Sequence, residues 1–481
     1  MNRENAYLTV FLTLCLTFIL PICLTLIDGV RWSGARLEAA CAAEAGLHSI
    51  MAEYHRELLE QYNLFAIDSS YGTSFCGKRN TEAHLMEYLR KNLSSEDLFL
   101  SDFLYGDFFG LKPEDAELTG VSILTDQKGG VFRKRAVEAL GDDIGLGLLE
   151  ELKEWLMVIE GSGLEEGNPE ELQESLEQQI QDFNGKEIQL PDGETAVLEV
   201  ESPTEVLARK RKLGILRLVT EEETISQNSI NPEELVMNRM GQGMVNVGNL
   251  EQALSEGDGL MERFLFQEYL LRYMGHYGSE HEKDALRYQI EYLIAGNGSD
   301  TDNLRSVVNR LCILREAANA MYLLSDQVKM EEIRIAAALA CSLLAVPELT
   351  PLLEGVIVLG WAYAESIYDV KSLLSGGRIP LIKDSDSWHY GLGTALRGEL
   401  QEETEGGQGL SYDDYLRVFM LMTNLDTLTG RAMDMVEADI RMCRGNRLFR
   451  LDGCYDRIRV CIRIRGVWDD GFEIIREKGY D

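Results

Sequence analysis

Asp300 and Asp302 could open a calcium-binding loop, because carboxylates at this spacing supply oxygen ligands to the ion. The remaining loop positions do not match. Arg305 stands where the sharp turn requires Gly, and Leu311 stands where the bidentate Glu is needed. The acidic and hydroxyl residues at 299–302 instead favour a helix cap. We therefore predict a capped helix that starts near this point and no calcium ion.

Residues 68–72 also combine a carboxylate with hydroxyls. They read Asp-Ser-Ser-Tyr-Gly and nearly match the Asp-x-Ser-x-Ser pattern that binds divalent metals in von Willebrand A domains. Gly72 stands where the second hydroxyl is needed, so one ligand is missing. We interpret the segment as a turn in which Asp68 and the serine hydroxyls bond the neighbouring backbone.

The six histidines and nine cysteines form no recognisable site. His276 and His281 lie close in sequence, but no further ligand follows at zinc spacing. We expect most of the cysteines to be buried small hydrophobic residues, with Cys443 and Cys454 as the pair considered for a disulfide. The sequence contains no phosphate-binding Gly-Lys-Ser loop and no nucleophile elbow. We therefore assign no catalytic, cofactor-binding or metal-ligating residue.

The charge of the chain restricts its partners. It has 481 residues, with 46 Lys and Arg against 81 Asp and Glu, which gives a formal net charge of −35. Contacts to phosphates need clustered cations, so we expect no binding to nucleic acid and no adhesion to anionic lipid surfaces. Apolar residues make up 45% of the chain, enough for a packed core.

Residues 6–27 are predicted to span a membrane. They form an uncharged run of 22 residues, which as a helix is about 33 Å long and exceeds the roughly 30 Å of a hydrocarbon core. The run is longer than the apolar region of a signal peptide, and no small-x-small cleavage site follows it closely. We therefore predict a single-pass anchor in the cell membrane. Basic residues flank both ends, and we favour an extracytoplasmic C-terminal bulk as the simplest arrangement.

Threonines recur every four residues along this segment and share one face of the expected helix. Small or hydroxylated residues at this spacing allow membrane helices to approach one another closely. The alternative is that each hydroxyl bonds a carbonyl of its own helix and contacts nothing else. The candidate helix-packing residues are Thr9, Thr13, Thr17 and Thr25.

Helical spacing of apolar residues continues beyond the apolar run and predicts one helix over about residues 6–61. A short strand is expected at 62–67 and another at 116–125, with a hairpin at 188–200 and an exposed or mobile acidic segment at 161–184. Two apolar stretches, 335–346 and 352–364, are too short to cross a bilayer and predict a buried helical hairpin. Further helices are expected at 412–422 and 425–442.

The C-terminal region contains the clearest strand. Ile458, Val460, Ile462 and Ile464 alternate with polar residues, which is the pattern of a half-buried strand, and a second strand is expected at 472–476. The arginines of the polar face would repel one another if they had no partners. Either acidic side chains of the same sheet neutralise them, or they form a docking face for an acidic partner. These arginines are Arg457, Arg459, Arg463 and Arg465.

Several segments of the chain resemble a family of unknown function from Gram-positive gut bacteria. Members of that family are often encoded beside tight-adherence (Tad/Flp) pilus and type II secretion-like genes, and their N-termini are similar to TadE/TadG minor pilins. The resemblance implies a pilin-like N-terminal helix and no established activity. Pilin precursors keep a Gly before the cleavage site, whereas no Gly precedes Gly29 here, which argues against prepilin processing and against a major filament subunit. The matching segments are 5–26, 51–65, 68–72, 288–296, 314–319 and 361–366.

Together these features predict an α+β fold that is mostly helical. It comprises a transmembrane helix continuing into a long pilin-like helix, a small antiparallel sheet with a C-terminal hairpin, and a helical subdomain. The expected segments are an anchor at 1–28, a helix with an α+β region at 29–160, an acidic part at 161–243, a helical subdomain at 244–376, and C-terminal helices with a hairpin at 377–481.

The expected function is that of a membrane-anchored structural or accessory component of a Tad-like pilus or a type II secretion-like assembly. Its expected partners are the membrane, through residues 6–27, and other components of that machine. The alternative is a cell-surface hydrolase, because sequence alone does not reveal which of 81 acids face one another. A ligand sensor is a third possibility, weakened by the lack of a signalling domain before the anchor.

Overall fold

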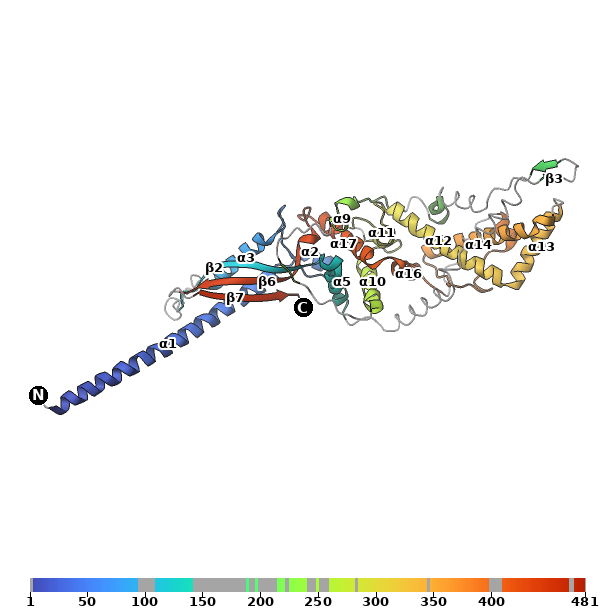
Figure 1. Cartoon of the computed structure of the whole chain (residues 1–481). Helices are drawn as coiled ribbons and strands as arrows, with labels where there is room; N and C mark the ends of the chain where they lie inside the picture. The colour runs from blue at the N-terminus through green and yellow to red at the C-terminus, as the bar shows by residue number, and fades with distance from the viewer. Residues whose placement is uncertain are drawn as a thin grey trace. The chain divides into compact units, whose positions relative to one another are not determined.

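The computed structural model confirms an α+β protein that is mostly helical (Figure 1). It describes residues 3–93, 109–141, 187–189, 195–197, 214–220, 225–239, 248–250, 259–281, 284–343, 347–397, 409–466 and 471–480. The chain divides into two compact units, and each is built from segments that are distant in sequence. The sheet unit comprises Met1–Ala136, Arg239–Ser255 and Cys443–Asp481, and the helical unit comprises Val137–Asn238 and Glu256–Met442.

A small sheet forms the centre of the sheet unit. Its longest strands are β2 (Lys112–Ile123), β6 (Cys454–Arg465) and β7 (Gly471–Gly479). β2 and β7 pair with opposite edges of β6 in antiparallel fashion, and β1 (Ile67–Asp68) continues the edge that β7 occupies. The short β5 (Gly248–Asn249) pairs in parallel with β2. The predicted C-terminal hairpin is therefore confirmed, and its first strand is the central strand of the sheet.

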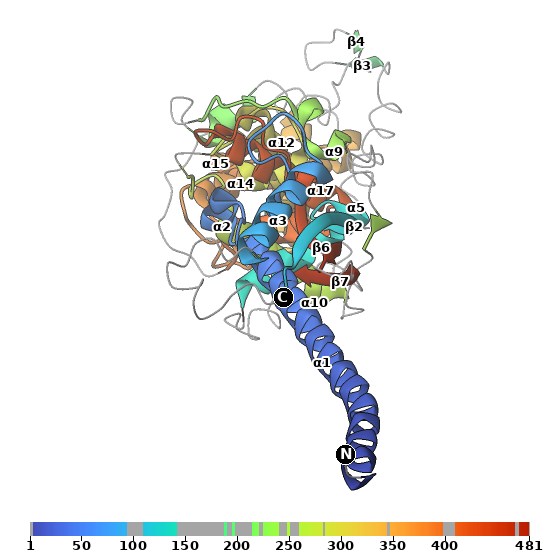
Figure 2. The same cartoon turned by 90° about the vertical axis from the view of Figure 1, so that its left-hand side faces the viewer.

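Two helices cover one face of this sheet. α1 (Arg3–Met51) packs with its C-terminal part against α3 (Lys78–Leu93) and β7, while α3 also contacts β2 (Figures 1 and 2). The shared core consists of small and branched side chains from all these elements, because alternation in the strands and helical spacing in α1 and α3 each turn one apolar stripe inward. Its most buried members include Ala39, Ala43, Leu47, Leu85, Leu89, Leu118, Ile458, Val460 and Ile462.

The prediction of a single helix over residues 6–61 is wrong, because the structure has two helices in this range. α1 ends at Met51, and a separate helix α2 (Arg56–Tyr62) follows after a short turn. His55 has an extended backbone, its Nδ1 accepts from the Leu58 amide at 3.3 Å, and its own amide donates to the Ala66 carbonyl at 2.9 Å. This cap and the bond to the returning chain end one helix and start the next. The predicted strand at 62–67 is correspondingly reduced to β1.

The helical unit is organised around two long neighbouring helices. α12 (Asp300–Ser325) packs along α14 (Thr350–Leu374), and α13 (Gln327–Leu343) forms a hairpin with α14. The helical hairpin predicted from the two apolar stretches is therefore confirmed, although one side of α13 is exposed. The other helices are α9 (Val236–Arg239), α10 (Gly259–Tyr273), α11 (Gln289–Ala295), α15 (Leu392–Arg397), α16 (Tyr412–Met422) and α17 (Leu425–Met442).

The unit boundaries cross the expected segments. The expected C-terminal segment 377–481 is divided, because α15, α16 and α17 belong to the helical unit whereas β6 and β7 belong to the sheet unit. α5 (Asp126–Leu140) follows β2, and β3 (Glu187–Gln189) with β4 (Thr195–Val197) forms the predicted hairpin. The acidic segment predicted at 161–184 lies outside the described residues.

Candidate functional site

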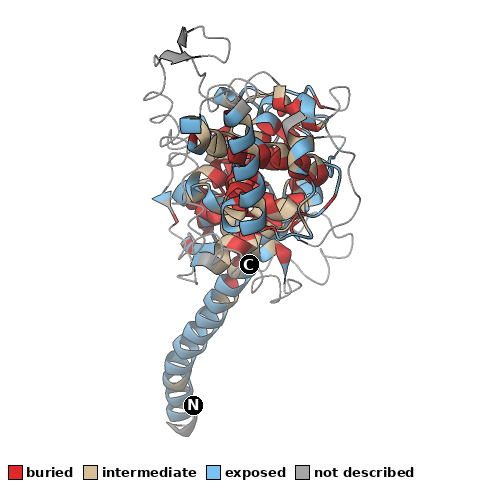
Figure 3. Cartoon of the chain, turned by 90° about the vertical axis from the view of Figure 1, so that its right-hand side faces the viewer, coloured by how far each residue is buried: buried red, intermediate tan, exposed pale blue. Residues whose placement is uncertain are grey.

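The N-terminal half of α1 is an apolar rod without packing partners in the described part of the chain (Figure 3). Leu8, Phe11 and Phe18 are 59%, 66% and 67% exposed, although such side chains are normally buried. α1 is also the one helix, among the described residues, that is long and apolar enough to cross a membrane. A surface of this kind marks a site of membrane or protein interaction. It is therefore a candidate membrane span.

Insertion of this rod into a bilayer is favourable. Thirteen of the residues at 6–27 are Leu, Ile, Phe or Val. At the centre of a span each contributes about −0.3 to −0.6 kcal/mol, so their sum is roughly −4 to −8 kcal/mol before the threonines and Pro21 oppose it. In water the same residues would remain hydrated, because nothing in the described sheet unit covers them.

Amphipathic aromatic residues lie at both ends of the apolar rod. Tyr7 lies at its start, and Trp32 lies about one turn after its end. Trp32 packs against Phe472 of β7 with ring centroids 5.9 Å apart, and the guanidinium of Arg36 lies over the indole at 5.6 Å. Aromatic and basic residues are enriched at the two interfaces of a bilayer. These positions are consistent with a candidate span at residues 6–27.

The C-terminal half of α1 holds the rod on the sheet unit. Gly46 allows close approach to α3, because a Cβ at this position would lie 3.2 Å from Cδ1 of Leu85 and 3.3 Å from Cδ2 of Leu89. Leu47 next to it is fully buried. Since the helix is continuous from Arg3 to Met51, its free and packed halves are mechanically one element.

The threonine hydroxyls of the rod bond carbonyls of their own helix. Thr13 donates to Val10 at 2.9 Å, and Thr17 donates to Thr13 at 2.6 Å. Thr25 donates to Ile22 at 2.9 Å, while the side chain of Thr9 lies outside the described residues. These bonds give each of the three described hydroxyls an acceptor within its own helix. Packing of this face against another membrane helix stays a prediction.

The arginines of β6 are paired within the sheet. Arg459 donates to Glu477 of β7 at 2.7 Å, and Arg457 bonds the same carboxylate at 3.4 Å. On the β2 side, Arg463 bonds Asp115 at 3.3 Å and Arg465 pairs with Glu114. The neutralisation by acidic neighbours is thus observed. A docking face for an acidic partner stays a prediction, and such a partner would compete with these four pairs.

The two acidic segments considered as metal sites have structural partners. Asp68 accepts from the amide of Ser70 at 2.9 Å and from its hydroxyl at 2.7 Å, which confirms the predicted turn. The hydroxyl of Ser299 accepts from the amide of Asp302 at 3.3 Å, which confirms a cap at the start of α12. Asp300 does something the sequence did not predict: it is fully buried and accepts from the Tyr288 amide at 3.0 Å.

The histidines and cysteines likewise fall into separate places. His276 lies 3.6 Å from Asp413, and His281 lies 3.2 Å from Asp284. No group of three His, Cys, Asp or Glu that could hold a metal is found among the described residues. Cys443 and Cys454 are both free thiols, and the sulfur of Cys443 accepts from the side-chain Nε2 of Gln61 at 3.1 Å. The disulfide suggested by their spacing is not formed.

A buried ionic cluster joins two of the sequence segments that carry the family resemblance. Arg315 from segment 314–319 is fully buried and donates through Nε to Asp369 at 3.0 Å. Asn319 donates to the same carboxylate oxygen at 3.0 Å. Lys383 pairs with both Asp369 and Glu365, the latter from segment 361–366. The cluster ties α12, α14 and the chain after α14 together.

The surroundings of Glu365 favour its ionised form. Burial by itself would raise the pKa of Glu365, but the hydrogen bond from His389 and the Lys383 ammonium outweigh it and lower that pKa. The amide of His389 donates to Glu365 at 3.0 Å and the amide of Tyr390 at 2.8 Å. The indole of Trp361 in turn donates to the Tyr390 carbonyl at 2.9 Å. The cluster therefore has a structural role in the helical unit.

The third segment, 288–296, lies in a second buried polar network. Gln289 donates to Asp439 of α17 at 2.6 Å, and the hydroxyl of Tyr292 donates to Asp434 at 3.0 Å. Glu291 accepts from the hydroxyl of Tyr412 at 2.9 Å. Sequence reasoning missed both networks. The available signal was a charged residue inside each apolar helical stretch, such as Glu365 and Arg315, which needs a buried partner.

The family match covers most of the helical unit together with parts of the sheet unit. The family of unknown function DUF5702 matches residues 193–466, more than half of the chain, and this range contains both buried networks and ends just after β6. The apolar rod of α1 lies outside the matched range. No curated protein and no solved structure matches the chain. The chain belongs to the family of unknown function DUF5702.

Proposed function

We propose that the protein is a membrane-anchored structural component of a Tad-like pilus or of a type II secretion-like assembly, and that it acts by docking to other proteins of that machine. The observation that carries the proposal is the division of α1. Its first half is an exposed apolar rod, and its second half forms the core of a small antiparallel sheet unit. The resemblance of the N-terminus to TadE/TadG minor pilins is the reason for proposing this kind of assembly.

This geometry suits an anchored scaffold. The rod places the sheet unit next to the bilayer, because Trp32 at the membrane end packs against Phe472 of β7. Docking partners would meet the sheet unit or the helical unit outside the membrane. The proposed orientation puts the C-terminal bulk outside the cytoplasm.

Charges placed in the middle of the rod should release the protein from the membrane. In the double variant Leu12→Arg/Leu16→Arg, each arginine costs about 2.5–3.5 kcal/mol at the centre of a span, which cancels most of the insertion free energy. We expect the variant to move from the alkali-resistant membrane fraction to the soluble fraction. In the native cell we further expect loss of surface filaments, measured by electron microscopy of a deletion strain complemented with this variant.

The matched control is Leu37→Arg. Leu37 is 67% exposed on the same helix but lies outside residues 6–27, so this variant should remain in the membrane and restore filaments. A soluble wild-type protein would contradict the anchor. Intact filaments in the deletion strain would contradict the role in assembly and leave the anchor standing.

A cysteine introduced into the helical unit should be labelled from outside the cell. Ser385 is exposed and differs from Cys by one atom, so Ser385→Cys adds a thiol without disturbing packing. A membrane-impermeant maleimide is expected to label it on intact cells to the extent seen after permeabilisation, above the background of the wild-type thiols. Labelling that requires permeabilisation would place the bulk inside the cell.

The hydrolase alternative gains no support from the contacts observed. A carboxylate pair for acid–base chemistry must face open space where substrate can enter. In the described part of the helical unit, the buried carboxylates of Glu365 and Asp369 both face Lys383. That arrangement fixes the fold, and we propose no hydrolytic activity.

A further inference from the structure

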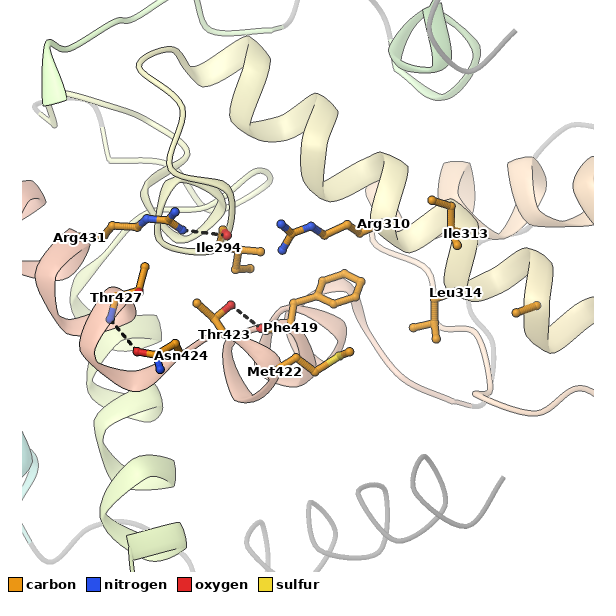
Figure 4. Close-up of a pocket in the computed structure, with 11 residues that line it drawn as sticks. Ile294, Arg310, Ile313, Leu314, Phe419, Met422, Thr423, Asn424, Thr427 and Arg431 are labelled. Carbon is orange, nitrogen blue, oxygen red and sulfur yellow. Dashed lines mark hydrogen bonds between the residues drawn. The ribbon is translucent and has the colours of Figure 1, made fainter. Parts of the chain in front are cut away.

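A surface pocket of about 590 Å³ lies in the helical unit (Figure 4). Its walls come from α11, α12, α16 and the start of α17, including the loop that joins the last two helices. This volume lies within the range of pockets that hold small organic ligands. Its central lining residues are Ile294, Arg310, Leu314, Phe419, Thr427 and Arg431.

Arg431 is built into one end of the pocket. Its Nη1 donates to the carbonyls of Leu293 at 2.8 Å and Ile294 at 2.9 Å, which end α11. Gly296 makes room for it: a Cβ at that position would overlap the guanidinium, and a φ of 79° favours Gly there in any case. The position of Arg431 is therefore fixed by backbone, while its other nitrogens remain near the pocket.

Arg310 enters from the opposite side. Figure 4 shows its guanidinium pointing toward that of Arg431 across Ile294. Burial lowers the pKa of Arg431, and the charge of Arg310 lowers it further, so the two groups repel each other. Arg310 has no ion pair or hydrogen bond with any residue in the described ranges, whereas Arg305 on the same helix pairs with Asp302 at 2.8 Å.

The charge of the lining is the unusual feature, although Asp434, which lies outside the lining, partly offsets the charge of Arg431. The chain carries 81 acids against 46 bases, yet the residues lining this pocket include two arginines and no carboxylate. Two like charges that face each other across an apolar wall are unfavourable without an anion between them. An anionic ligand would offset this repulsion and would accept hydrogen bonds from the guanidinium N–H groups of Arg310 and Arg431.

The rest of the wall defines the body of that ligand. Phe419 and Ile294 are buried, and Ile313 is 45% exposed on the pocket rim. A strongly hydrated dianion would lose its water against such walls without full compensation. A carboxylate on an apolar body fits better, because the guanidinium fork pairs with a carboxylate through two parallel hydrogen bonds.

We propose that this pocket binds a small organic acid, whose carboxylate lies between Arg310 and Arg431 and whose apolar body contacts Leu314, Phe419 and Ile313. The site is independent of the anchoring role of α1, since all of its residues belong to the helical unit. The proposal assigns a ligand-binding function to the helical unit, separate from the proposed anchoring function of α1.

The test uses 4-phenylbutanoate as the probe and the full-length protein in lipid nanodiscs, by isothermal titration calorimetry against empty nanodiscs. We expect saturable binding at one site per chain. The uncharged 4-phenylbutan-1-ol, which keeps the apolar body, and acetate, which keeps the charge, should each bind at least about tenfold more weakly. Equal affinity for the acid and the alcohol, or no saturable binding of the acid, would overturn the proposal.

Variants locate the site. Arg310→Gln should weaken 4-phenylbutanoate binding about tenfold or more, and Ile313→Glu should abolish it by supplying a competing carboxylate. Both positions are exposed, so the thermal unfolding of each variant should match that of the wild type. Arg305→Gln is the control, since it removes an exposed arginine of the same helix outside the pocket. Unchanged binding in Arg310→Gln would refute the assignment.

Discussion

Replacing Arg315 by Met should lower the free energy of unfolding of the helical unit by about 3–5 kcal/mol. The substitution keeps a long apolar stem but removes a fully buried guanidinium. Asp369 then loses its 3.0 Å partner, and the carbonyls of Pro380 and Leu381 each lose a donor at 2.9 Å. A buried polar group that loses a partner carries a large desolvation cost. The Leu381 carbonyl and the Asp369 carboxylate are buried, although Asp369 keeps its contacts with Asn319 and Lys383.

Denaturant titration followed by tryptophan fluorescence measures this effect. Trp361 and Trp388 belong to the helical unit, and Trp361 bonds the Tyr390 carbonyl beside the ionic cluster. Trp32 and Trp468 belong to the sheet unit, so both are replaced by Phe in the protein used for this measurement, and the remaining emission then reports on the helical unit. A local probe is needed because a chain of two units need not unfold in one step. The cluster is the structural feature that joins two of the family-like segments, so its loss should disturb more than one helix.

The control for Arg315 is Arg305→Met on the same helix. Arg305 pairs with Asp302 at 2.8 Å, but its side chain is 47% exposed. Exposed pairs contribute about 0–1 kcal/mol, so the control should shift the midpoint little. Similar shifts in the two variants would show that the buried cluster contributes no more than a surface pair.

Truncation of Leu47 to Ala should destabilise the sheet unit by about 2–5 kcal/mol. Leu47 is fully buried where α1 meets α3, next to Gly46, whose missing side chain brings the two helices together. A cavity at this point cannot collapse easily. β6 is held by its pairing with β2 and β7, and α3 is held by its packing on β2. The consequence for function is a weaker connection between the membrane rod and the sheet.

Hydrogen exchange of the amides in β6 measures this change, because protection of a central strand follows the stability of its unit. Leu37→Ala on the same helix removes the same atoms from a side chain that is 67% exposed. Protection should fall in Leu47→Ala and remain unchanged in Leu37→Ala. If both variants retained full protection, the packed half of α1 would not be part of the cooperative core.

Local patterns were enough to predict many elements of this protein. The helices at 412–422 and 425–442 are found with those bounds, and alternation in the C-terminal strand correctly placed its apolar residues on the buried face. The cap of α12 and the apolar character of α1 were equally visible. These features depend on spacing within a few residues, where helix and strand periodicities act directly.

Tertiary structure decided which distant residues meet. The partners of the β6 arginines include Asp115, which is 348 positions away in sequence, and no local pattern distinguishes such a pair from a free cationic face. The break before α2 arises from a bond between His55 and Ala66, which the periodicity of either segment does not contain.

The candidate anchor and the pocket differ in the same way, because the first depends on local sequence and the second on tertiary packing. The sequence by itself determined the apolar rod and made it a candidate membrane span, because an uncharged run of 22 residues is long enough to cross a bilayer whatever the rest of the chain does. The ionic cluster and the two-arginine pocket were decided only by tertiary packing, because their groups come from segments spread over residues 294–431. Charges so far apart in the chain acquire partners, or lack them, only once the helices that carry them have packed.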